Sequence, residues 1–341
     1  MKRFIKNHKI LSFILLVVLA AILSVALFIY AKLSKISYHD GTIEEEIALE
    51  NVEIIENEEV QSSNQVEEVI EHSEMISDDE LAQLDEMEVI LSDDVPVVDE
   101  DVFNILLLGT DERTAEFSTN ARADSIMLLS LDKSNNTMKL VSLQRGMGVP
   151  VLEGQYKDQY DWITHIFRYG GADLMLKTVR DMFNVDVEYY VRVNFNTFTQ
   201  LIDSVGGVDI ELTELEAQGL NGEVKTNARA KHMMYAGMNH LDGYDALQYS
   251  RLRYTDSDWQ RVQRQRNVIH EVMVKAKNMG ILELNNSLDT VLPLIQTNLS
   301  KTDIVGLVSY FPAVLGGEFE QMTIPASGTY GSMKGMGNRT L

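Results

Sequence analysis

Two aspartates that border apolar segments are candidate functional residues, because their positions could allow them to bind a metal ion. Asp111 comes directly after a run that ends at Gly109-Thr110, and Asp124 comes directly before the run at 125–131. Paired carboxylates at neighbouring strand ends can hold Mg²⁺, which takes one or two protein oxygens and keeps several waters. The same residues could instead cap turns, and the spacing alone leaves both interpretations open.

Arginines form the second chemically capable set. Arg145 ends a third apolar segment. A later stretch is rich in arginine and holds Arg251, Arg253, Arg261, Arg264 and Arg266. Guanidinium groups match phosphate oxygens in bidentate fashion, so this set indicates an anion site. Arg261 and Gln265 fall on one helical face. The alternative is a salt-bridged surface with Asp256 and Asp258, and we assign Arg266 to such a surface.

The elements that must position these residues alternate between strands and helices. Short apolar runs predict strands at 103–109, 125–131, 138–143, 188–193, 208–212 and 319–324, with a polar hairpin turn at 132–137. Helical periodicity predicts helices at 172–183, 195–205, 244–252, 258–279 and 302–315. Interleaved strands and helices predict an α/β sandwich with a mixed central sheet flanked by helices.

The N-terminal third has a different character. Residues 10–31 are an uncharged run of 22, about 33 Å long as a helix, which predicts a transmembrane anchor rather than a cleaved signal peptide. The richer basic flank at 1–9 predicts a cytoplasmic tail, with everything after the anchor outside the cell. Residues 32–101 are dense in acid and predict a mostly disordered extracellular linker. The domain then occupies 102–341.

The charge distribution excludes several functions. The chain has a net charge of -23, of which 40–101 carries -24 with no Lys or Arg, whereas 102–341 carries only -5. We therefore expect no nucleic-acid partner, because that affinity depends on a basic face. The absence of Cys excludes disulfides, zinc thiolates and thiol nucleophiles. We expect no Ser-His-Asp set, and we assign surface or core roles to His165, His232, His240 and His270.

Four segments occur in an order and at spacings that form one pattern. They are FNILLLGTDER, ARADSIMLLSLDKSNNTMKLVSLQR, YYVRVNFNTFTQLIDSVGGVDIEL and LDGYDALQYSRLRYTDSDWQRVQRQ. They resemble the extracellular domain of the LytR-CpsA-Psr family, with similarity from about 103 to 279 and looser similarity beyond. The resemblance implies an α/β sandwich with an apolar pocket for a polyprenyl chain. It also implies a membrane-anchored protein of a Gram-positive type bacterium.

The resemblance further implies an enzyme. Members of the family are expected to transfer an anionic glycopolymer, such as teichoic acid or capsular polysaccharide, from a polyprenyl-pyrophosphate carrier to peptidoglycan, with pyrophosphate hydrolysis as a side reaction. Asp111 and Asp124 match the pair that binds Mg²⁺ (or Mn²⁺). The positions that match pyrophosphate-binding residues are Arg122, Arg145, Arg251, Arg253, Arg261 and Gln265. We expect Arg145, Asp124 and Asp111 to be catalytic.

Three departures from the family pattern keep a second hypothesis open. Gly146 replaces an acidic residue beside Arg145, Trp162-Ile163-Thr164 replaces a Lys-Ile-Asn stretch, and Val149 replaces an arginine of some members. The alternative function is a non-catalytic protein that binds polyprenyl phosphate or cell wall. A transcriptional role finds no support, since a tail of about nine residues leaves no room for a DNA-binding domain. The pattern also implies a last strand and helix beyond 338–341.

Overall fold

The computed structural model describes residues 31, 34–38, 99, 101–112, 116–118, 120–253, 258–300, 302–304, 307, 318–326 and 329–336. The predicted cytoplasmic tail, almost all of the predicted transmembrane run and linker, and most of the helix predicted at 302–315 lie outside these residues. Within the part that is described, no helix has the length and hydrophobicity needed to span a bilayer.

A seven-stranded mixed sheet forms the centre of the domain. Its order is β1 (Ser37–Tyr38), β10 (Gln296–Thr297), β7 (Tyr189–Val193), β2 (Val102–Thr110), β3 (Ala123–Asp132), β4 (Thr137–Leu143) and β11 (Glu318–Ile324). The pairs β2–β3, β3–β4 and β10–β7 are antiparallel, whereas β2–β7, β4–β11 and β1–β10 are parallel. The predicted mixed sheet and the hairpin turn between β3 and β4 are confirmed.

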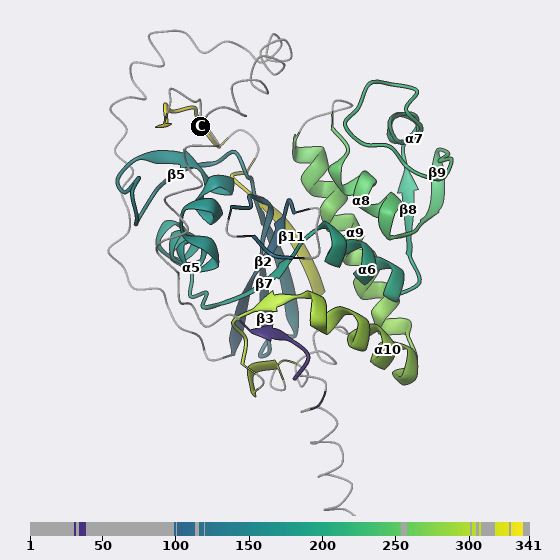
Figure 1. Cartoon of the computed structure of the whole chain (residues 1–341), viewed down its shortest axis with the longest axis horizontal. Coiled ribbons are helices and arrows are strands. Elements are labelled where there is room, and N and C mark those ends of the chain that lie inside the picture. The colour runs from purple at the N-terminus through teal and green to yellow at the C-terminus, as the bar shows by residue number, and fades with distance from the viewer. Residues whose placement is uncertain are drawn as a thin grey trace, which may run out of the picture.

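Helices flank the sheet, as Figure 1 shows. The helix α5 (Ile163–Phe183) lies on one side, and α6 (Phe195–Ser204), α8 (Gly243–Arg251), α9 (Asp258–Asn278) and α10 (Ile281–Val291) lie on the other. The outermost unit pairs the hairpin of β8 (Val208–Leu212) and β9 (Gly237–Leu241) with α7 (Glu214–Asn221). The short β5 (Gly148–Pro150) and β6 (Tyr160–Trp162) pair beside α5.

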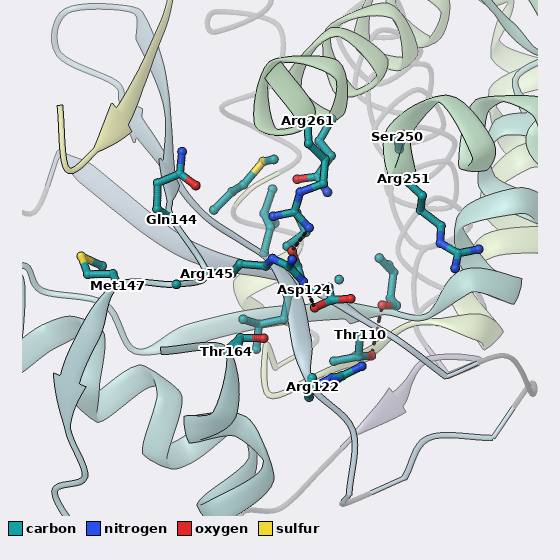
Figure 2. Close-up of a pocket in the computed structure, with 18 of the residues that line it drawn as sticks. Thr110, Arg122, Asp124, Gln144, Arg145, Met147, Thr164, Ser250, Arg251 and Arg261 are labelled. Carbon is teal, nitrogen blue, oxygen red and sulfur yellow. Dashed lines mark hydrogen bonds and ion pairs between the residues drawn. The ribbon is translucent and has the colours of Figure 1, made fainter. Parts of the chain in front are cut away.

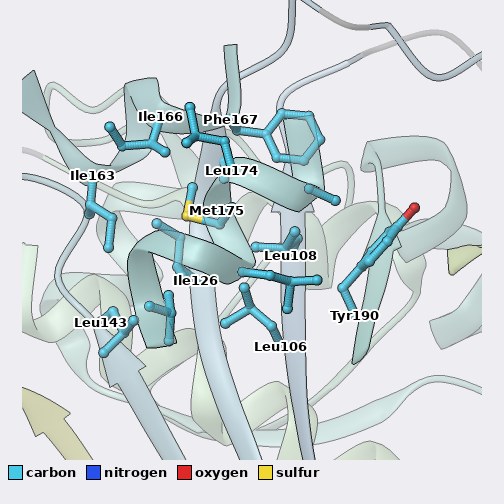
Figure 3. Packing of buried hydrophobic residues seen from close by; sticks show 14 of the residues in the cluster. Leu106, Leu108, Ile126, Leu143, Ile163, Ile166, Phe167, Leu174, Met175 and Tyr190 are labelled. Atoms are coloured by element: carbon cyan, nitrogen blue, oxygen red, sulfur yellow. The ribbon is translucent and has the colours of Figure 1, made fainter. Parts of the chain in front are cut away.

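The alternating side chains of β2 divide between the two layers. Leu106 and Leu108 are buried in the cluster that packs under α5 with Ile126 and Met175 (Figure 3). Leu107, between them in the sequence, points to the opposite face because successive side chains of a strand alternate. Burial of each leucine contributes about 1.5–3 kcal/mol. One strand therefore builds the α5 layer with one set of residues and faces the helical layer with the other.

Two parts of the chain contain secondary structure where the sequence predicts none. The helix predicted at 172–183 is present, and a further helical segment that begins at Ile163 precedes it. The non-helical residues Gly170 and Gly171 separate the two segments, which together form α5. Gly171 has a φ of 63°, a conformation that glycine adopts without strain. The acidic composition predicts a linker over 32–101, yet Ser37–Tyr38 forms a strand of the sheet and Ile36 is buried. The Lys35 Nζ donates to Asp289 Oδ1 at 2.7 Å.

A buried arginine connects the sheet to the loop that follows β2. Arg192 on β7 is 4% exposed, and its Nε donates to Thr110 Oγ1 at 3.2 Å. Its Nη1 donates to Gln296 Oε1 at 2.9 Å. Its Nη2 donates to Glu112 Oε1 and, at 2.7 Å, to the carbonyl oxygen of Ser118. Burial lowers the pKa of Arg192, and the nearby Glu112 carboxylate opposes that shift. This guanidinium holds the segment from which Asp111 projects.

Replacing Arg192 with Met should lower the free energy of unfolding by about 3–5 kcal/mol, because the buried Glu112 loses its cationic partner. Urea denaturation of both proteins measures the difference. The control is Lys139→Met, which breaks an exposed pair with Glu320 and should cost less than about 1 kcal/mol. Equal losses in the two variants would contradict a structural role for the buried pair.

Candidate active site

A cavity of about 1770 Å³ lies between the sheet and the helical layer. Its inner walls are apolar. They are formed by Leu107, Met127 and Val191 on the sheet, Phe198, Leu201 and Ile202 on α6, and Val268, Ile269, Val272 and Met273 on α9. Its polar lining is dominated by arginines and one aspartate, namely Arg122, Arg145, Arg251, Arg253, Arg261 and Asp124. The cavity is therefore amphipathic.

A β-bulge directs Asp124 into this cavity. Gly109 pairs with Ser125 and Thr110 pairs with Ala123, so Asp124 is an extra residue of β3 with no partner in the register. An extra residue bends its strand locally and re-aims the side chain. A Cβ at Gly109 would lie 3.0 Å from the Cβ of Ser125, so glycine allows the two strands to approach here. The backbone thus sets the position of this carboxylate.

Asp124 is surrounded by positive charge. Arg145 Nη1 donates to Asp124 Oδ1 at 3.0 Å, and Arg261 Nη1 donates to the carbonyl oxygen of Asp124 at 3.5 Å. Figure 2 shows Asp124 and Arg145 pointing toward each other below Arg261. Burial by itself would raise the pKa of Asp124, but the charges of Arg145, Arg122 and Arg261 lower it below the ordinary value. Asp124 is therefore ionised at neutral pH.

Asp111 lies next to this group and binds Arg122. Its Oδ1 accepts from the Arg122 backbone N–H at 2.9 Å, and its Oδ2 accepts from Nε at 3.1 Å. Asp111 is not among the described residues that line the cavity, whereas Arg122 is. The structure thus brings the two predicted aspartates to the same end of the β2–β3 pair, each with its own arginine.

The later arginines come from the end of α8 and from α9. Arg251 lies in the last turn of α8, and its Cζ is 4.6 Å from the centre of the Phe195 ring. Arg253 follows in the loop, and Arg261 and Gln265 line the cavity from α9. Arg264 points elsewhere: it is 1% exposed, and its Nη1 donates to the carbonyl oxygen of Leu252 at 2.9 Å. It thereby holds the backbone between Arg251 and Arg253.

Comparison with known proteins decides the family. The model of the LytR_cpsA_psr family matches residues 58–338. The chain belongs to this family. A curated relative, the polyisoprenyl-teichoic acid–peptidoglycan teichoic acid transferase TagT of Bacillus subtilis, is 32% identical over 227 residues, which cover 66% of this chain and 68% of TagT.

Two solved structures are similar to this member of the family. A structure described as TagT bound to LIIa-WTA has a TM-score of 0.54 at 30% identity and covers 69% of this chain and 83% of that one. A structure described as the LytR-CPS2A-psr family protein YwtF (TagT) with bound octaprenyl pyrophosphate lipid has a TM-score of 0.50 at 28% identity. It covers 70% of this chain and 83% of its own.

The donor set of this LytR_cpsA_psr protein fits the magnesium ion that the family resemblance implies. Asp124 is held in the ionised form that a metal ligand requires. A carboxylate has about four lone-pair sites, so the bonds from Arg122 to Asp111 and from Arg145 to Asp124 leave acceptor capacity on both. Hard oxygen ligands are those that Mg²⁺ prefers, and one or two carboxylates suffice.

The structure corrects the assignment of Arg266 to the surface. Arg266 is 8% exposed, and its Nη1 donates to the carbonyl oxygen of Met322 at 3.1 Å and to Thr323 Oγ1. These contacts join α9 to β11 at the sheet edge. The arginines of α9 therefore contact different parts of the fold. Arg261 lines the cavity on the face that it shares with Gln265, whereas Arg264 and Arg266 project from other faces of the helix.

The four histidines occupy the surface and core positions that the sequence led us to expect. The side chains of His232, His240 and His270 are 59%, 58% and 44% exposed, as assigned. His165 is 3% exposed and lines the cavity, and its Nδ1 lies 2.9 Å from Asp161 Oδ2. A signal was present in the sequence, since 161, 165 and 169 are spaced by four residues, but this spacing alone does not separate a buried cluster from an exposed helix face.

The Asp161 carboxylate is fully buried and well bonded. Its Oδ2 accepts from Tyr169 OH at 2.5 Å, and its Oδ1 accepts from the backbone N–H of Trp162 at 2.8 Å. Burial by itself would raise the pKa of Asp161. The hydrogen bonds from His165 and Tyr169 outweigh burial and lower it to about 2, from an ordinary value of 3.8.

This shift predicts a pH dependence of stability. The folded-state pKa of Asp161 is lower than its ordinary value. Its ionised carboxylate therefore contributes fully to the free energy of unfolding above about pH 4, and this contribution is lost as the pH falls toward 2. Its size is about 2 kcal/mol. Asp161→Asn should therefore flatten the decline of the unfolding free energy between pH 4 and 2, measured by urea denaturation at each pH. A variant with the wild-type slope would contradict the shift.

Proposed function

We propose that this protein transfers an anionic glycopolymer, of the teichoic acid or capsular polysaccharide type, from a polyprenyl-pyrophosphate carrier to peptidoglycan. The amphipathic cavity is the observation that carries the proposal. Its walls suit a long apolar chain, and its arginines suit two linked phosphates. The names of similar proteins agree with this substrate class, since one is called a teichoic acid transferase and another holds octaprenyl pyrophosphate.

The arginines act first by binding and orientation. Arg145, Arg251, Arg253 and Arg261 bind the pyrophosphate oxygens from several sides. Guanidinium groups are suited to this task because they remain charged and donate in a fixed fork. The apolar walls hold the polyprenyl chain and exclude water from its path. Most of the catalysis of phosphoryl transfer comes from such positioning and charge stabilisation.

Asp124 keeps the arginines in place for the reaction. Its carboxylate accepts a hydrogen bond from Arg145 Nη1, and its carbonyl oxygen accepts one from Arg261 Nη1. Asp111 fixes Arg122 in the same way. The same two aspartates would hold Mg²⁺ (or Mn²⁺), which when bound would supply further neutralisation of phosphate charge. The polar end of the cavity would then be arranged around the phosphates before the acceptor arrives.

The location of the protein is part of the proposal. The apolar run at 10–31 and its basic flank support a single-pass membrane protein with the domain outside the cell. A lipid-linked donor and a peptidoglycan acceptor both occur there, which agrees with this orientation.

Arg145→Met should lower the rate of glycan transfer about 10²–10³-fold, because a donor to the developing phosphate charge is lost. The assay uses the full-length protein in lipid vesicles with Mg²⁺, a polyprenyl-pyrophosphate-linked disaccharide and peptidoglycan fragments. Lys139→Met, which changes an exposed lysine on β4, should keep the wild-type rate. Donor binding by the wild type without any turnover would contradict the transferase and favour a non-catalytic binding protein.

The purified full-length protein should carry polyprenyl phosphate, detectable by mass spectrometry of the extracted lipid. Val272→Asp should remove it, because burying a charge against the lipid chain is unfavourable. The matched control is Val274→Asp on the same helix, a position that is 37% exposed. Equal lipid content in both variants would contradict the assignment of the cavity to the lipid chain.

A further inference from the structure

The pair of Asp161 and His165 resembles the carboxylate–imidazole arrangements that transfer protons in enzymes. Asp161 is 0% exposed and His165 is 3% exposed, and 2.9 Å separates Oδ2 from Nδ1. His165 lines the same cavity as Asp124 and Arg145. A carboxylate in this position orients the imidazole and stabilises the cation that forms when the ring accepts a proton.

The partner of His165 determines which ring nitrogen carries the proton. Asp161 is ionised, so it only accepts hydrogen bonds. The Nδ1 of a neutral His165 must therefore be the donor to Oδ2. The lone pair then lies on Nε2, on the other side of the ring. The histidine is thus prepared as a base rather than as an acid.

Backbone and side-chain bonds connect the start of α5 to the site of the arginines. The backbone N–H of Thr164 donates to the carbonyl oxygen of Arg145 at 3.2 Å, and Thr164 Oγ1 donates to the carbonyl oxygen of Ala123 at 2.9 Å. The backbone N–H of Ile163 donates to the carbonyl oxygen of Met147 at 2.8 Å. His165 is therefore held next to the residues that precede Asp124 and follow Arg145, and Figure 2 shows Thr164 below Arg145.

The geometry points to His165 as the general base that takes the proton of the acceptor hydroxyl, a role that rests on the proposed transfer reaction. The hydroxyl oxygen bonds to the phosphorus that carries the glycan, and the bond from that phosphorus to the bridging oxygen breaks. The electron pair of the broken bond stays on polyprenyl phosphate. The hydroxyl proton moves to Nε2 of His165, and the imidazolium later releases it to solvent. Asp161 is the positioning residue.

The charged and titratable groups around the imidazole are its bonded neighbours and the charged residues that line the cavity. Asp161 and Tyr169 are bonded to each other and lie beside the ring. Trp162 packs against the ring at 5.4 Å between centres. The charged groups that line the shared cavity are Arg122, Asp124, Arg145, Arg251, Arg253 and Arg261. Protonation of His165 thus adds a positive charge to a cationic site, so a bound pyrophosphate is needed to balance it.

His165→Asn tests the proposal, because an asparagine amide can still donate to Asp161 but cannot accept the proton. Transfer by the full-length protein in vesicles should fall about 10²–10⁴-fold. The loss of rate on acidification that protonation of a histidine base causes should disappear in this variant. Binding of the polyprenyl-pyrophosphate donor should stay at the wild-type level. A merely structural role predicts instead that rate and pH profile survive in this variant.

A second histidine provides the matched control. His240 Nδ1 lies 2.8 Å from Asp209 Oδ1 on the β8–β9 hairpin, the same pair of groups at an exposed position. His240→Asn should keep the wild-type rate and pH profile. Asp161→Asn should lower kcat with little change in KM for the donor, since it disturbs the orientation of the base and not the arginines.

The outcomes separate this inference from the proposed function. Absence of transfer by the wild type contradicts the transferase itself. Transfer by the wild type together with an unchanged rate in His165→Asn contradicts only the role of His165. If that variant does not fold, nitrogen NMR of the wild-type imidazole decides. A proton on Nδ1 with a lone pair on Nε2 supports the base, and the opposite tautomer overturns it.

Discussion

The attraction between Asp124 and the arginines around it sets the geometry of the polar end of the cavity. Several guanidinium groups in one place repel each other unless negative charge lies among them. Asp124 supplies that charge between Arg145 and Arg261, and Asp111 does so for Arg122. Two carboxylates do not balance all the arginines that line the cavity. The excess positive charge is the physical reason why a doubly charged phosphate ligand suits this site.

The arginines of this domain fall into two groups that differ in their partners. Arg192, Arg264 and Arg266 are almost fully buried, and their bonds go to carboxylates, hydroxyls and backbone carbonyls. They join loops, helices and strands, and a change in them would act through the fold. Arg145, Arg251 and Arg261 line the cavity instead. Bonding partners, and not burial or residue type, separate the two groups, since Arg261 is also only 4% exposed and yet lines the cavity.

Much of the fold and of the candidate site was predictable from the sequence. The strand at 208–212 and the helices near 195–205 and 258–279 agree with the structure within a residue, because strong apolar periodicity and flanking glycines mark them. The β1 and β10 strands were missed because two residues show no alternation. The first part of α5 was missed because Gly170 and Gly171 interrupt the helical pattern. The membrane anchor at 10–31 and the magnesium ion stay predictions.

The sequence by itself determined which residue types are available and roughly where each element lies. Strand ends and helical faces made Asp111, Asp124 and the later arginines candidates, and the family resemblance then implied their roles in binding a metal ion and a pyrophosphate. Only the tertiary structure brought these arginines together in one cavity, since that depends on how α8 and α9 pack over the sheet. It also decided that the local pair of Asp161 and His165 is buried and that His165 lines the same cavity as Arg145. Contacts between distant segments depend on packing, and local patterns do not encode them uniquely.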